Sequence, residues 1–512
     1  MSAIETARRL VERLIVVGVT DAVLAPGSRS GPLALALHAA DARGLIRLHV
    51  RVDEREAAFL ALGLAKVQGR TVPVVTTSGT AVTNLHPALL EALHAHVPVL
   101  AVTADRPARL RGTGANQTTD QREIFPGVPF LDDVDTLATT SGPQHLNVEL
   151  DEPLVEPVDW QLDATRVPPP EPSALRPVGV GNVRRTVVVA GDGSGRAAAD
   201  LAESAGWPLL AEPTSGARSS TNAIGPYRLL LQRPDLADRI EQVVSFGHAT
   251  LSRPVTALLA RKDVVVVHVG DRSTFPVPAS SNVAFVPAVQ IEGEGDPEWL
   301  EQWRRAGREA AGAIEDELDG TTTYDVARIV DRSVPDGGLL VVGSSNPIRD
   351  LDLVGGTSGD RTVLGNRGLA GIDGLLSTAV GAALAHEFTR AVAFVGDLTF
   401  LHGSNGLLIG PDEPRPDLTI VVANDDGGSI FSTLEQGSPE YAAAFERVYA
   451  TPTGADLAAL CAGYRIPHRR VSVDELAAAL AAPPSGIEVV EVAVDRASRR
   501  DLAARLARAV GV

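Results

Sequence analysis

Two acidic clusters that follow neighbouring apolar runs are the residues best suited to chemistry in this chain. Asp397 follows the run 391–395, and Asp425 follows a second run, 418–422. Both runs are short, rich in β-branched residues and free of polar alternation, which is typical of parallel strands buried on both faces. Because open α/β sheets bind ligands at the carboxyl ends of their strands, these carboxylates and a carbonyl near Gly427 predict a site for a divalent cation and a diphosphate.

The spacing of the two clusters resembles the fingerprint of the thiamin-diphosphate (ThDP) enzymes, GDG followed by about 26 residues and then NN. Leu398 stands at the second Gly of that pattern and Asp425 at its second Asn, so the ligand set carries one additional negative charge. The resemblance implies that Asp397, Asp425 and the carbonyl of Gly427 hold Mg²⁺ or Mn²⁺. Taken alone, GD and ND at strand ends are also common turn chemistry.

A stretch near the N-terminus resembles the pyrimidine-binding domain of the same enzymes. It reads VDEREAAFLALGLAKVQGRTVPVVTTSGTAVTN from Val52, with Glu54 in register with the family's glutamate. In that role a carboxyl group binds the aminopyrimidine ring and stabilises the imino tautomer, whose nitrogen takes the proton from the thiazolium carbon. The resemblance also places Ser78 and Gly79 at the cofactor. The alternative is that Glu54 and Glu56 are solvated charges that open a helix.

Four further motifs narrow the resemblance. They are APGSRSGPLALAL (25–37), TADRPARLRGTGANQTTDQ (103–121), SSNPIRDLD (344–352) and GNRGLAGIDGLLSTAVGAAL (365–384). Together they resemble the 2-succinyl-5-enolpyruvyl-6-hydroxy-3-cyclohexene-1-carboxylate (SEPHCHC) synthases of menaquinone biosynthesis. The likeness extends over nearly the whole chain and is weak between residues 151 and 331.

This resemblance implies a transferase that decarboxylates 2-oxoglutarate with ThDP and adds the succinyl carbanion to isochorismate. Both substrates are dicarboxylates, and a guanidinium holds a carboxylate bidentately without losing its charge. For any single Arg, a surface role is the alternative. The expected substrate-binding residues are Ser28, Arg29, Arg106, Asn116, Gln117, Ser345, Arg349, Arg367 and Phe431. Ile430 is expected at the apolar wall of the site, and Ile372 either bends the cofactor into its V shape or simply packs at a helix start.

Composition excludes several other functions. The formal net charge of −18 argues against nucleic-acid and anionic-membrane partners. Lys66 and Lys262 are the only lysines, which disfavours pyridoxal chemistry. The single cysteine, Cys461, excludes a disulfide framework and a cysteine-built zinc site. No apolar run is long enough to span a membrane, so we expect no membrane insertion and a cytoplasmic protein.

Alternating helical patterns and short buried strands predict an α/β protein of three doubly wound parallel-sheet domains, of the ThDP-dependent decarboxylase and carboligase type. We expect a pyrimidine-binding domain at 1–165, a central structural domain at 186–318 and a diphosphate- and metal-binding domain at 321–512. A proline-rich linker, 158–185, should be extended and exposed. The central domain contains GDGSG at 191–195, which resembles a nucleotide loop only weakly, and we expect it to bind neither FAD nor another cofactor.

The resemblance also implies a homodimer or homotetramer with active sites between subunits, because Glu54 and the metal site lie in different domains. Three alternatives remain at this level. The chain could be another ThDP-dependent 2-oxo-acid decarboxylase or an acetohydroxyacid synthase-like enzyme. It could also be a flavin or nicotinamide oxidoreductase, or a nonenzymatic homologue.

Overall fold

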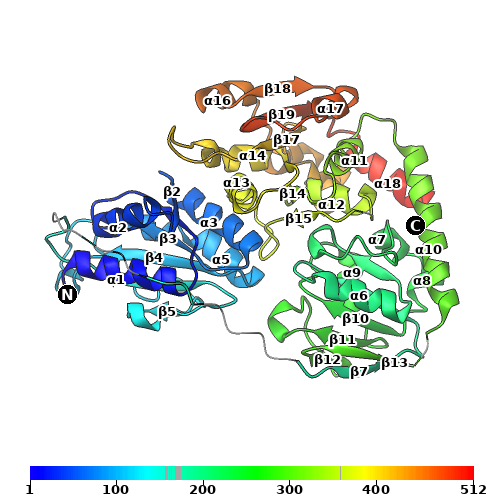
Figure 1. The fold of residues 1–512 in the computed structure, drawn as a ribbon. Coiled ribbons are helices and arrows are strands. Elements are labelled where there is room, and N and C mark those ends of the chain that lie inside the picture. Colours follow the sequence, from blue (N-terminus) through cyan, green and yellow to red (C-terminus); the bar gives the residue numbers. More distant parts are fainter. Residues whose placement is uncertain (156–159, 161, 163, 168–174, 294, 358) are drawn as a thin grey trace. The chain divides into compact units, whose positions relative to one another are not determined.

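The computed structural model describes residues 1–512 except 156–159, 161, 163, 168–174, 294 and 358, and it shows an α/β protein (Figure 1). Its named strands all pair in parallel, which confirms the predicted fold class. The chain forms two compact units. The first unit comprises Met1–Pro172, Gly368–Glu387 and His402–Pro416, and the second comprises Ser173–Arg367, Phe388–Leu401 and Asp417–Val512.

The first unit contains a six-stranded sheet in the order β2-β1-β3-β4-β6-β5. Its strands are β1 (Asp21–Leu24), β2 (Arg47–Val50), β3 (Val72–Thr76), β4 (Val99–Asp105), β5 (Phe130–Leu131) and β6 (Gln144–Glu149). Its helices are α1 (Ala3–Val16), α2 (Gly31–Asp41), α3 (Glu54–Gln68), α4 (Thr80–Thr83), α5 (His86–Ala95) and α13 (Leu375–Ala385). β1, β3 and β4 are buried along their whole length, as their apolar runs predict.

Helix α3 begins and ends at residues that favour its termini. The Asp53 side chain accepts the N–H groups of Arg55 and Glu56, and Gly69 ends the helix in the left-handed conformation. The middle of α3 packs closely against α13. A Cβ atom on Gly63 would overlap the carbonyl oxygen of Thr378, so this approach of two helix backbones requires a residue without a side chain.

The second unit contains a five-stranded sheet, β12-β11-β10-β8-β9, a two-stranded sheet, β13-β7, and a six-stranded sheet, β15-β14-β16-β17-β19-β18. The strands of the two smaller sheets are β7 (Val178–Gly181), β8 (Thr186–Ala190), β9 (Leu209–Ala211), β10 (Gln242–Phe246), β11 (Val265–Val269), β12 (Val283–Val286) and β13 (Val289–Glu292). Those of the larger sheet are β14 (Leu339–Val342), β15 (Thr362–Leu364), β16 (Ala391–Gly396), β17 (Leu418–Asn424), β18 (His468–Val471) and β19 (Ile487–Ala493).

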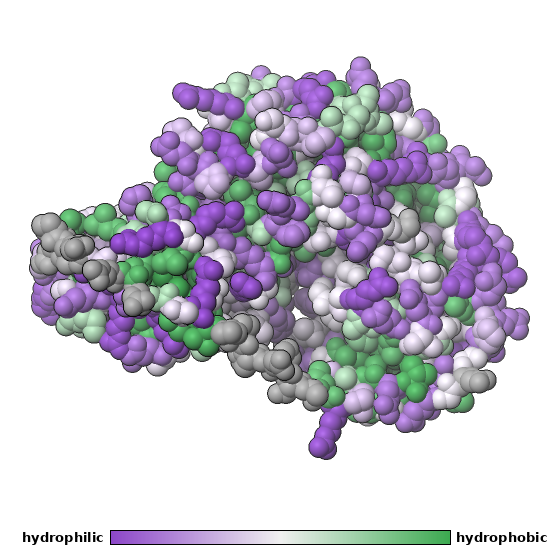
Figure 2. All heavy atoms as spheres, viewed as in Figure 1, coloured by the Kyte–Doolittle hydropathy of each residue, from purple (hydrophilic) through white to green (hydrophobic). Residues whose placement is uncertain are grey.

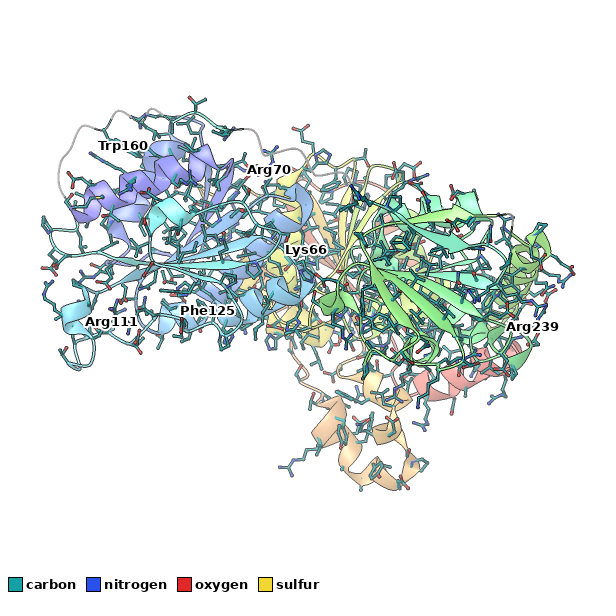
Figure 3. The ribbon with its side chains drawn as sticks, turned by 90° about the horizontal axis from the view of Figure 1, so that it is seen from below. Lys66, Arg70, Arg111, Phe125, Trp160 and Arg239 are labelled. Atoms are coloured by element: carbon teal, nitrogen blue, oxygen red, sulfur yellow. The ribbon has the colours of Figure 1, made fainter. Side chains whose placement is uncertain are left out.

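Helices of the second unit surround these sheets (Figure 1). They include α6 (Arg196–Ala205), α7 (Tyr227–Leu230), α8 (Pro234–Ala237), α9 (Arg253–Leu259), α10 (Pro297–Glu317), α11 (Thr323–Ser333), α12 (Asn346–Val354), α15 (Ala442–Phe445), α16 (Leu457–Gly463), α17 (Val473–Ala479) and α18 (Arg499–Ala509). The charged helix α10 buries Trp299 and Trp303 in the core beside the five-stranded sheet. Trp299 also donates a hydrogen bond of 2.8 Å to the carbonyl of Thr186, and Arg239 lies over its ring (Figure 3).

One element differs from the prediction. Residues 178–181 of the expected linker form β7, which pairs with β13. Residues 168–174 of the same stretch lie outside the described residues. The pairing partner follows more than a hundred residues later, so the local sequence carried no sign of it.

Figure 2 shows hydrophilic side chains over much of the face in view, with smaller hydrophobic patches between them. Among the described residues, no helix combines the length and the apolar character that a membrane span requires.

Candidate cofactor and substrate site

The two acidic clusters lie at one edge of the larger sheet in the second unit. β16 and β17 are parallel neighbours in which Gly396 pairs with Ala423, so the residues that follow both strands emerge together. Asp397 opens helix α14 (Asp397–His402). Burial and, to a smaller extent, the charge of Asp425 raise the pKa of the Asp397 carboxyl to about 7. Burial likewise raises the pKa of Asp425 to about 6.

This edge fits a divalent cation bound to a diphosphate. Asp425 Oδ1 is buried and has no hydrogen-bond partner among the described residues, although a buried carboxylate oxygen normally has one. A cation would satisfy that oxygen and offset the repulsion between the two carboxylates. The described residues contain no group of three or more His, Cys, Asp or Glu side chains that could hold a metal, so the remaining ligands would be other oxygens, such as those of carbonyl groups, phosphate or water.

The start of α12 adjoins the same edge. Asn346, its first residue, donates a hydrogen bond of 2.6 Å from Nδ2 to Ser429 Oγ. Ser429 in turn hydrogen-bonds Asp425 and lowers the pKa that burial raises. Ser429 opens the 3₁₀ helix Ser429–Thr433, which carries Ile430 and Phe431. The structure therefore brings Ser345, which caps α12, close to the segment predicted to form the apolar wall.

Two arginines predicted to bind substrate also lie close together in the second unit. Burial and, to a smaller extent, the charges of Arg367 and Arg228 lower the pKa of the Arg349 guanidinium to about 10. Arg349 donates to the carbonyl of Ser345 at 2.7 Å, and Arg367 donates to Thr250 Oγ1 at 3.1 Å. Neither arginine forms an ion pair with any described residue. Two adjacent guanidinium groups that form no direct ion pair with a described carboxylate are suited to a carboxylate ligand.

The first unit holds the predicted glutamate. Glu54 is the first residue of α3 and is half-buried. Asn84, from the TN motif, donates a hydrogen bond to Glu54 Oε2 at 3.4 Å. The TN motif therefore contacts the predicted glutamate in the folded protein. The GIDG segment packs against the same helix, because a Cβ on Gly374 would overlap the ring of Phe59. Ile372 is half-buried in this segment.

A second pair of predicted arginines lies in the first unit. Arg29 is 6% exposed, and its Nη1 donates to the carbonyl of Leu150 at 2.9 Å. Burial lowers the pKa of Arg29, and the charge of Arg106 lowers it further, which shows that these two guanidinium groups also lie near each other.

The remaining predicted residues of this unit lie at strand ends and in loops. Ser28, Asn116 and Gln117 are exposed, whereas Ser78 is buried. A Cβ built on Gly79 would lie 3.3 Å from the Cβ of Gln117, so the TSG and GANQ motifs are in contact.

The alternative in which Glu54 and Glu56 are both solvated charges fails at Glu56. Glu56 is not a solvated charge but is 1% exposed, and Ser377 Oγ donates to its Oε2 at 2.5 Å. Burial raises the pKa of Glu56 to about 7. The apolar neighbours Phe59 and Leu60, three and four residues later, are the signal that this position faces the core.

Two further buried polar residues were not predicted. Glu212, in the central part of the chain, is 1% exposed, accepts the N–H of Leu251 at 2.8 Å and interacts electrostatically with Arg367. Gln121 is fully buried and hydrogen-bonds Gly79. Gln121 is the last residue of the motif at 103–121, although no role was predicted for it, and Glu212 lies outside the quoted motifs.

Comparison with known proteins identifies the family of the chain. Residues 4–124 match the family model of the thiamine pyrophosphate enzyme N-terminal TPP-binding domain, and residues 354–492 match that of the C-terminal TPP-binding domain. A SEPHCHC synthase from Nocardioides sp. is 54% identical over 99% of this chain and 97% of its own length. SEPHCHC synthases from Kineococcus radiotolerans and Saccharopolyspora erythraea are 47% and 44% identical, each over 98% of this chain and over 97% and 98% of their own lengths. The chain therefore belongs to the SEPHCHC synthase family of thiamin-diphosphate-dependent transferases.

Proposed function

We propose that this protein decarboxylates 2-oxoglutarate and adds the remaining succinyl unit to isochorismate, releasing carbon dioxide and forming SEPHCHC in menaquinone biosynthesis. Relatives that carry this name match the chain over nearly its full length. The observation that carries the proposal is the pair Arg349 and Arg367, which form no direct ion pair with a described carboxylate and lie in the same unit as the two buried aspartates. The aspartates would bind the metal ion that holds the phosphates of the cofactor, and the arginines would bind a carboxylate of the substrate.

ThDP supplies the electron sink that a 2-oxo acid needs in order to lose carbon dioxide. Glu54 would bind the aminopyrimidine ring nitrogen through its carboxyl group and hold a proton there, with Asn84 orienting the carboxyl. The guanidinium groups of Arg349 and Arg367, and of Arg29 and Arg106, would hold substrate carboxylates. Ser28, Asn116, Gln117 and Ser345 would donate or accept hydrogen bonds with the substrates.

The metal is proposed to be Mg²⁺ or Mn²⁺. The side chains of Asp397 and Asp425 and the carbonyl of Gly427 would be its protein ligands, with Ile430 and Ile372 as apolar contacts of the cofactor. The unpartnered Oδ1 of Asp425 supports this set. The raised pKa values mean that these two buried carboxylates bind protons when no cation is present. The affinity for the metal should therefore decrease as the pH drops below about 7.

We also propose an oligomeric state, a domain organisation and a cellular location for the protein. We propose a homodimer or homotetramer whose active sites each combine Glu54 of one subunit with the metal site of another. We propose three domains at 1–165, 186–318 and 321–512, and each of these ranges contains its own parallel sheet. A single cysteine supports a reducing compartment such as the cytoplasm.

The direct test is an assay with purified protein, Mg²⁺, ThDP, 2-oxoglutarate and isochorismate that follows the absorbance of isochorismate. We expect the absorbance to fall only when all components are present. Omission of 2-oxoglutarate separates the proposed reaction from slow decay of isochorismate. An absorbance that persists in the complete mixture would overturn the proposal, and consumption of pyruvate in place of 2-oxoglutarate would indicate a different ThDP carboligase.

A further inference from the structure

A buried glutamine forms hydrogen bonds with residues at the ends of three strands in the first unit. Gln121 is fully buried, and its side-chain amide makes three hydrogen bonds. Oε1 accepts the N–H of Gly79 at 3.1 Å, just after β3, and Nε2 donates to the carbonyl of Ala104 in β4 at 3.3 Å and to Asn147 Oδ1 in β6 at 3.0 Å. One side chain therefore fixes the spacing of three neighbouring strand ends.

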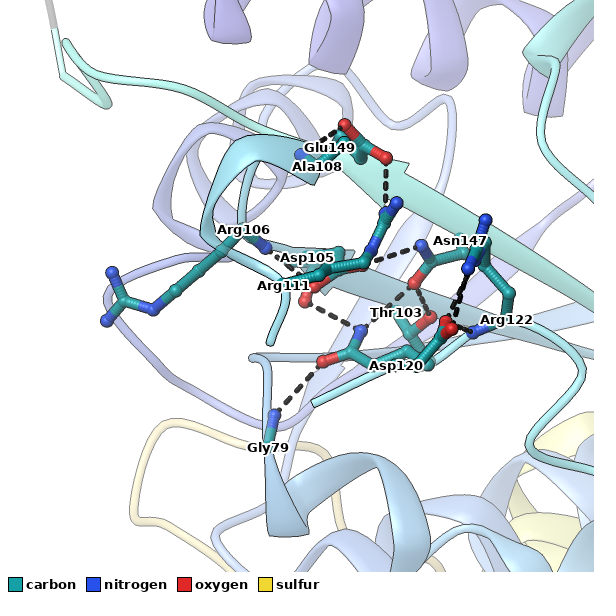
Figure 4. Close-up of polar contacts among 12 residues, drawn as sticks. Gly79, Thr103, Asp105, Arg106, Ala108, Arg111, Asp120, Arg122, Asn147 and Glu149 are labelled. Carbon is teal, nitrogen blue, oxygen red and sulfur yellow. Dashed lines mark hydrogen bonds and ion pairs between the residues drawn. The ribbon is translucent and has the colours of Figure 1, made fainter. Parts of the chain in front are cut away.

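The network of hydrogen bonds ends at a buried carboxylate, which determines the donor and the acceptor of each bond. Asn147 Nδ2 donates to Asp105 Oδ2 at 3.0 Å, and the same oxygen accepts from Arg111 at 3.0 Å. Thr103 Oγ1 donates to Asn147 Oδ1 at 2.9 Å, so this oxygen accepts twice (Figure 4). Since Asp105 accepts only, Asn147 must present its oxygen to Gln121, and Gln121 must present its own oxygen to Gly79. Arg111 lies on the segment that follows β4 (Figure 3).

Both ends of the network reach residues assigned to the cofactor or the substrate. At one end, Gly79 has a φ of +87° and is in contact with Gln117, four residues before Gln121. At the other end, Asp105 Oδ1 accepts the backbone N–H of Arg106 at 2.7 Å. Loss of the Gln121 amide would leave the Gly79 N–H and the Ala104 carbonyl without their partner, and both segments would be free to shift.

We propose that Gln121 is a positioning residue of the synthase, which holds the Gly79–Gln117 contact and the Arg106 segment in place through one buried amide. It acts through these neighbours and not on the substrate. The inference rests on the proposed function, and it gives a role to the last residue of the motif at 103–121, for which the sequence predicted none. The residue for comparison is Thr103, which is equally buried in the same network but whose side chain, among the described residues, hydrogen-bonds Asn147 and His145 alone.

The test compares Gln121→Met, which keeps the length of the side chain and removes all three hydrogen bonds, with Thr103→Val as a matched control. Two quantities are measured on the full-length enzyme with Mg²⁺: the KM for 2-oxoglutarate, and the ThDP dissociation constant from titration calorimetry. For Gln121→Met we expect both to rise by about tenfold or more, because small displacements of binding groups have effects of this size. For Thr103→Val we expect both to stay within about twofold of wild type at a similar loss of thermal stability.

Gln121→Glu provides a second, independent readout should the Met variant fail to fold. Its carboxyl keeps an acceptor for the Gly79 N–H but loses the amide donors to Ala104 and Asn147. We expect near-wild-type ThDP affinity together with a raised KM for 2-oxoglutarate, a split that general destabilisation would not produce. Equal effects of the Gln121 and Thr103 variants, or a Glu variant that weakens ThDP alone, would overturn the inference. If wild type consumes no isochorismate, the proposed function fails, while the ThDP titration still decides the role of Gln121.

Discussion

Two carboxyl groups two residues apart on α3 have different environments. Glu54 is half-buried at the helix start and receives a hydrogen bond from Asn84, whereas Glu56 is buried beside Ser377. Residues at i and i+2 of a helix point to different faces, so one carboxyl group is not able to replace the other at a single ligand. The two positions therefore offer a matched pair for mutation.

The first prediction concerns this pair. Glu54→Gln should lower kcat by about 10²- to 10⁴-fold, the range for loss of a proton-transfer group, while ThDP binding stays within a few-fold. Glu56→Gln keeps an oxygen that accepts from Ser377, and it should leave kcat within a few-fold of wild type. Steady-state kinetics and ThDP titration calorimetry measure both effects. If the Glu56 variant shows the large loss and the Glu54 variant does not, the catalytic glutamate has been misassigned.

The second prediction concerns the buried Glu212. Burial raises its pKa from 4.5 to about 8 in the folded protein. Between these values the unfolded chain loses its proton and the folded chain keeps it, so stability present below pH 4.5 is lost as the pH rises to about 8. Glu212→Gln removes this pH-dependent loss of stability, because the Gln side chain does not titrate. The free energy of unfolding of the variant minus that of wild type should therefore increase between pH 5 and pH 8, on the order of a few kcal/mol.

Urea unfolding at several pH values measures this difference. Glu203 is the control, because its carboxyl is exposed and hydrogen bonds lower its pKa, so Glu203→Gln should produce no such rise over the same range. Parallel curves for wild type and Glu212→Gln would show that Glu212 is not protonated in the folded protein at neutral pH.

The sequence predicted the motif residues of the site but not their supporting contacts. Asp397, Asp425 and Glu54 could be predicted because the chemistry fixes their residue types and spacing. Gln121 could not, since its partner Gly79 lies 42 residues away and no spacing rule connects them. Glu212 was missed for the same reason, because its electrostatic partner Arg367 is distant in the sequence.

At the scale of elements, the buried strands were the most predictable feature. The apolar runs 391–395 and 418–422 form β16 and β17, as their β-branched composition predicts. What the local sequence did not reveal is which elements pack together. Residues 368–387 were assigned to the third domain, yet in the structure they belong to the first unit, where α13 packs on α3.

The third prediction tests that helix pair. Gly63→Ala places a Cβ atom into the carbonyl oxygen of Thr378, so the two backbones must separate. We expect a loss of stability of about 1–3 kcal/mol, typical of overpacking. Gly312→Ala is the matched control, because Gly312 also lies inside a helix, α10, with no atom near the added Cβ. It should be neutral or should stabilise by up to about 1 kcal/mol.

Thermal and urea unfolding of the two variants measure the difference. A Gly63→Ala variant as stable as Gly312→Ala would show that the helices are not in close contact in solution.

At the scale of the whole molecule, the proposed site requires groups from both units. Glu54 and the arginine pair Arg29 and Arg106 lie in the first unit, while Asp397 and Asp425 lie in the second. Local sequence patterns identify each set, but they do not decide whether a functional site takes both sets from one chain or from two. We propose two chains, and activity in mixed oligomers distinguishes the two arrangements.

The fourth prediction uses hybrid dimers purified through two different affinity tags. When a Glu54→Gln chain is paired with an Asp397→Asn chain, a site shared between chains leaves one intact combination per dimer, so about half of the wild-type activity should remain. When a wild-type chain is paired with a chain that carries both substitutions, every shared site lacks one group and the hybrid should be inactive. Sites confined to single chains give the opposite pattern, with the first hybrid inactive and the second half-active. Since the two hybrids contain the same substitutions in the same total amounts, differences in stability or metal content do not account for a reversal between them.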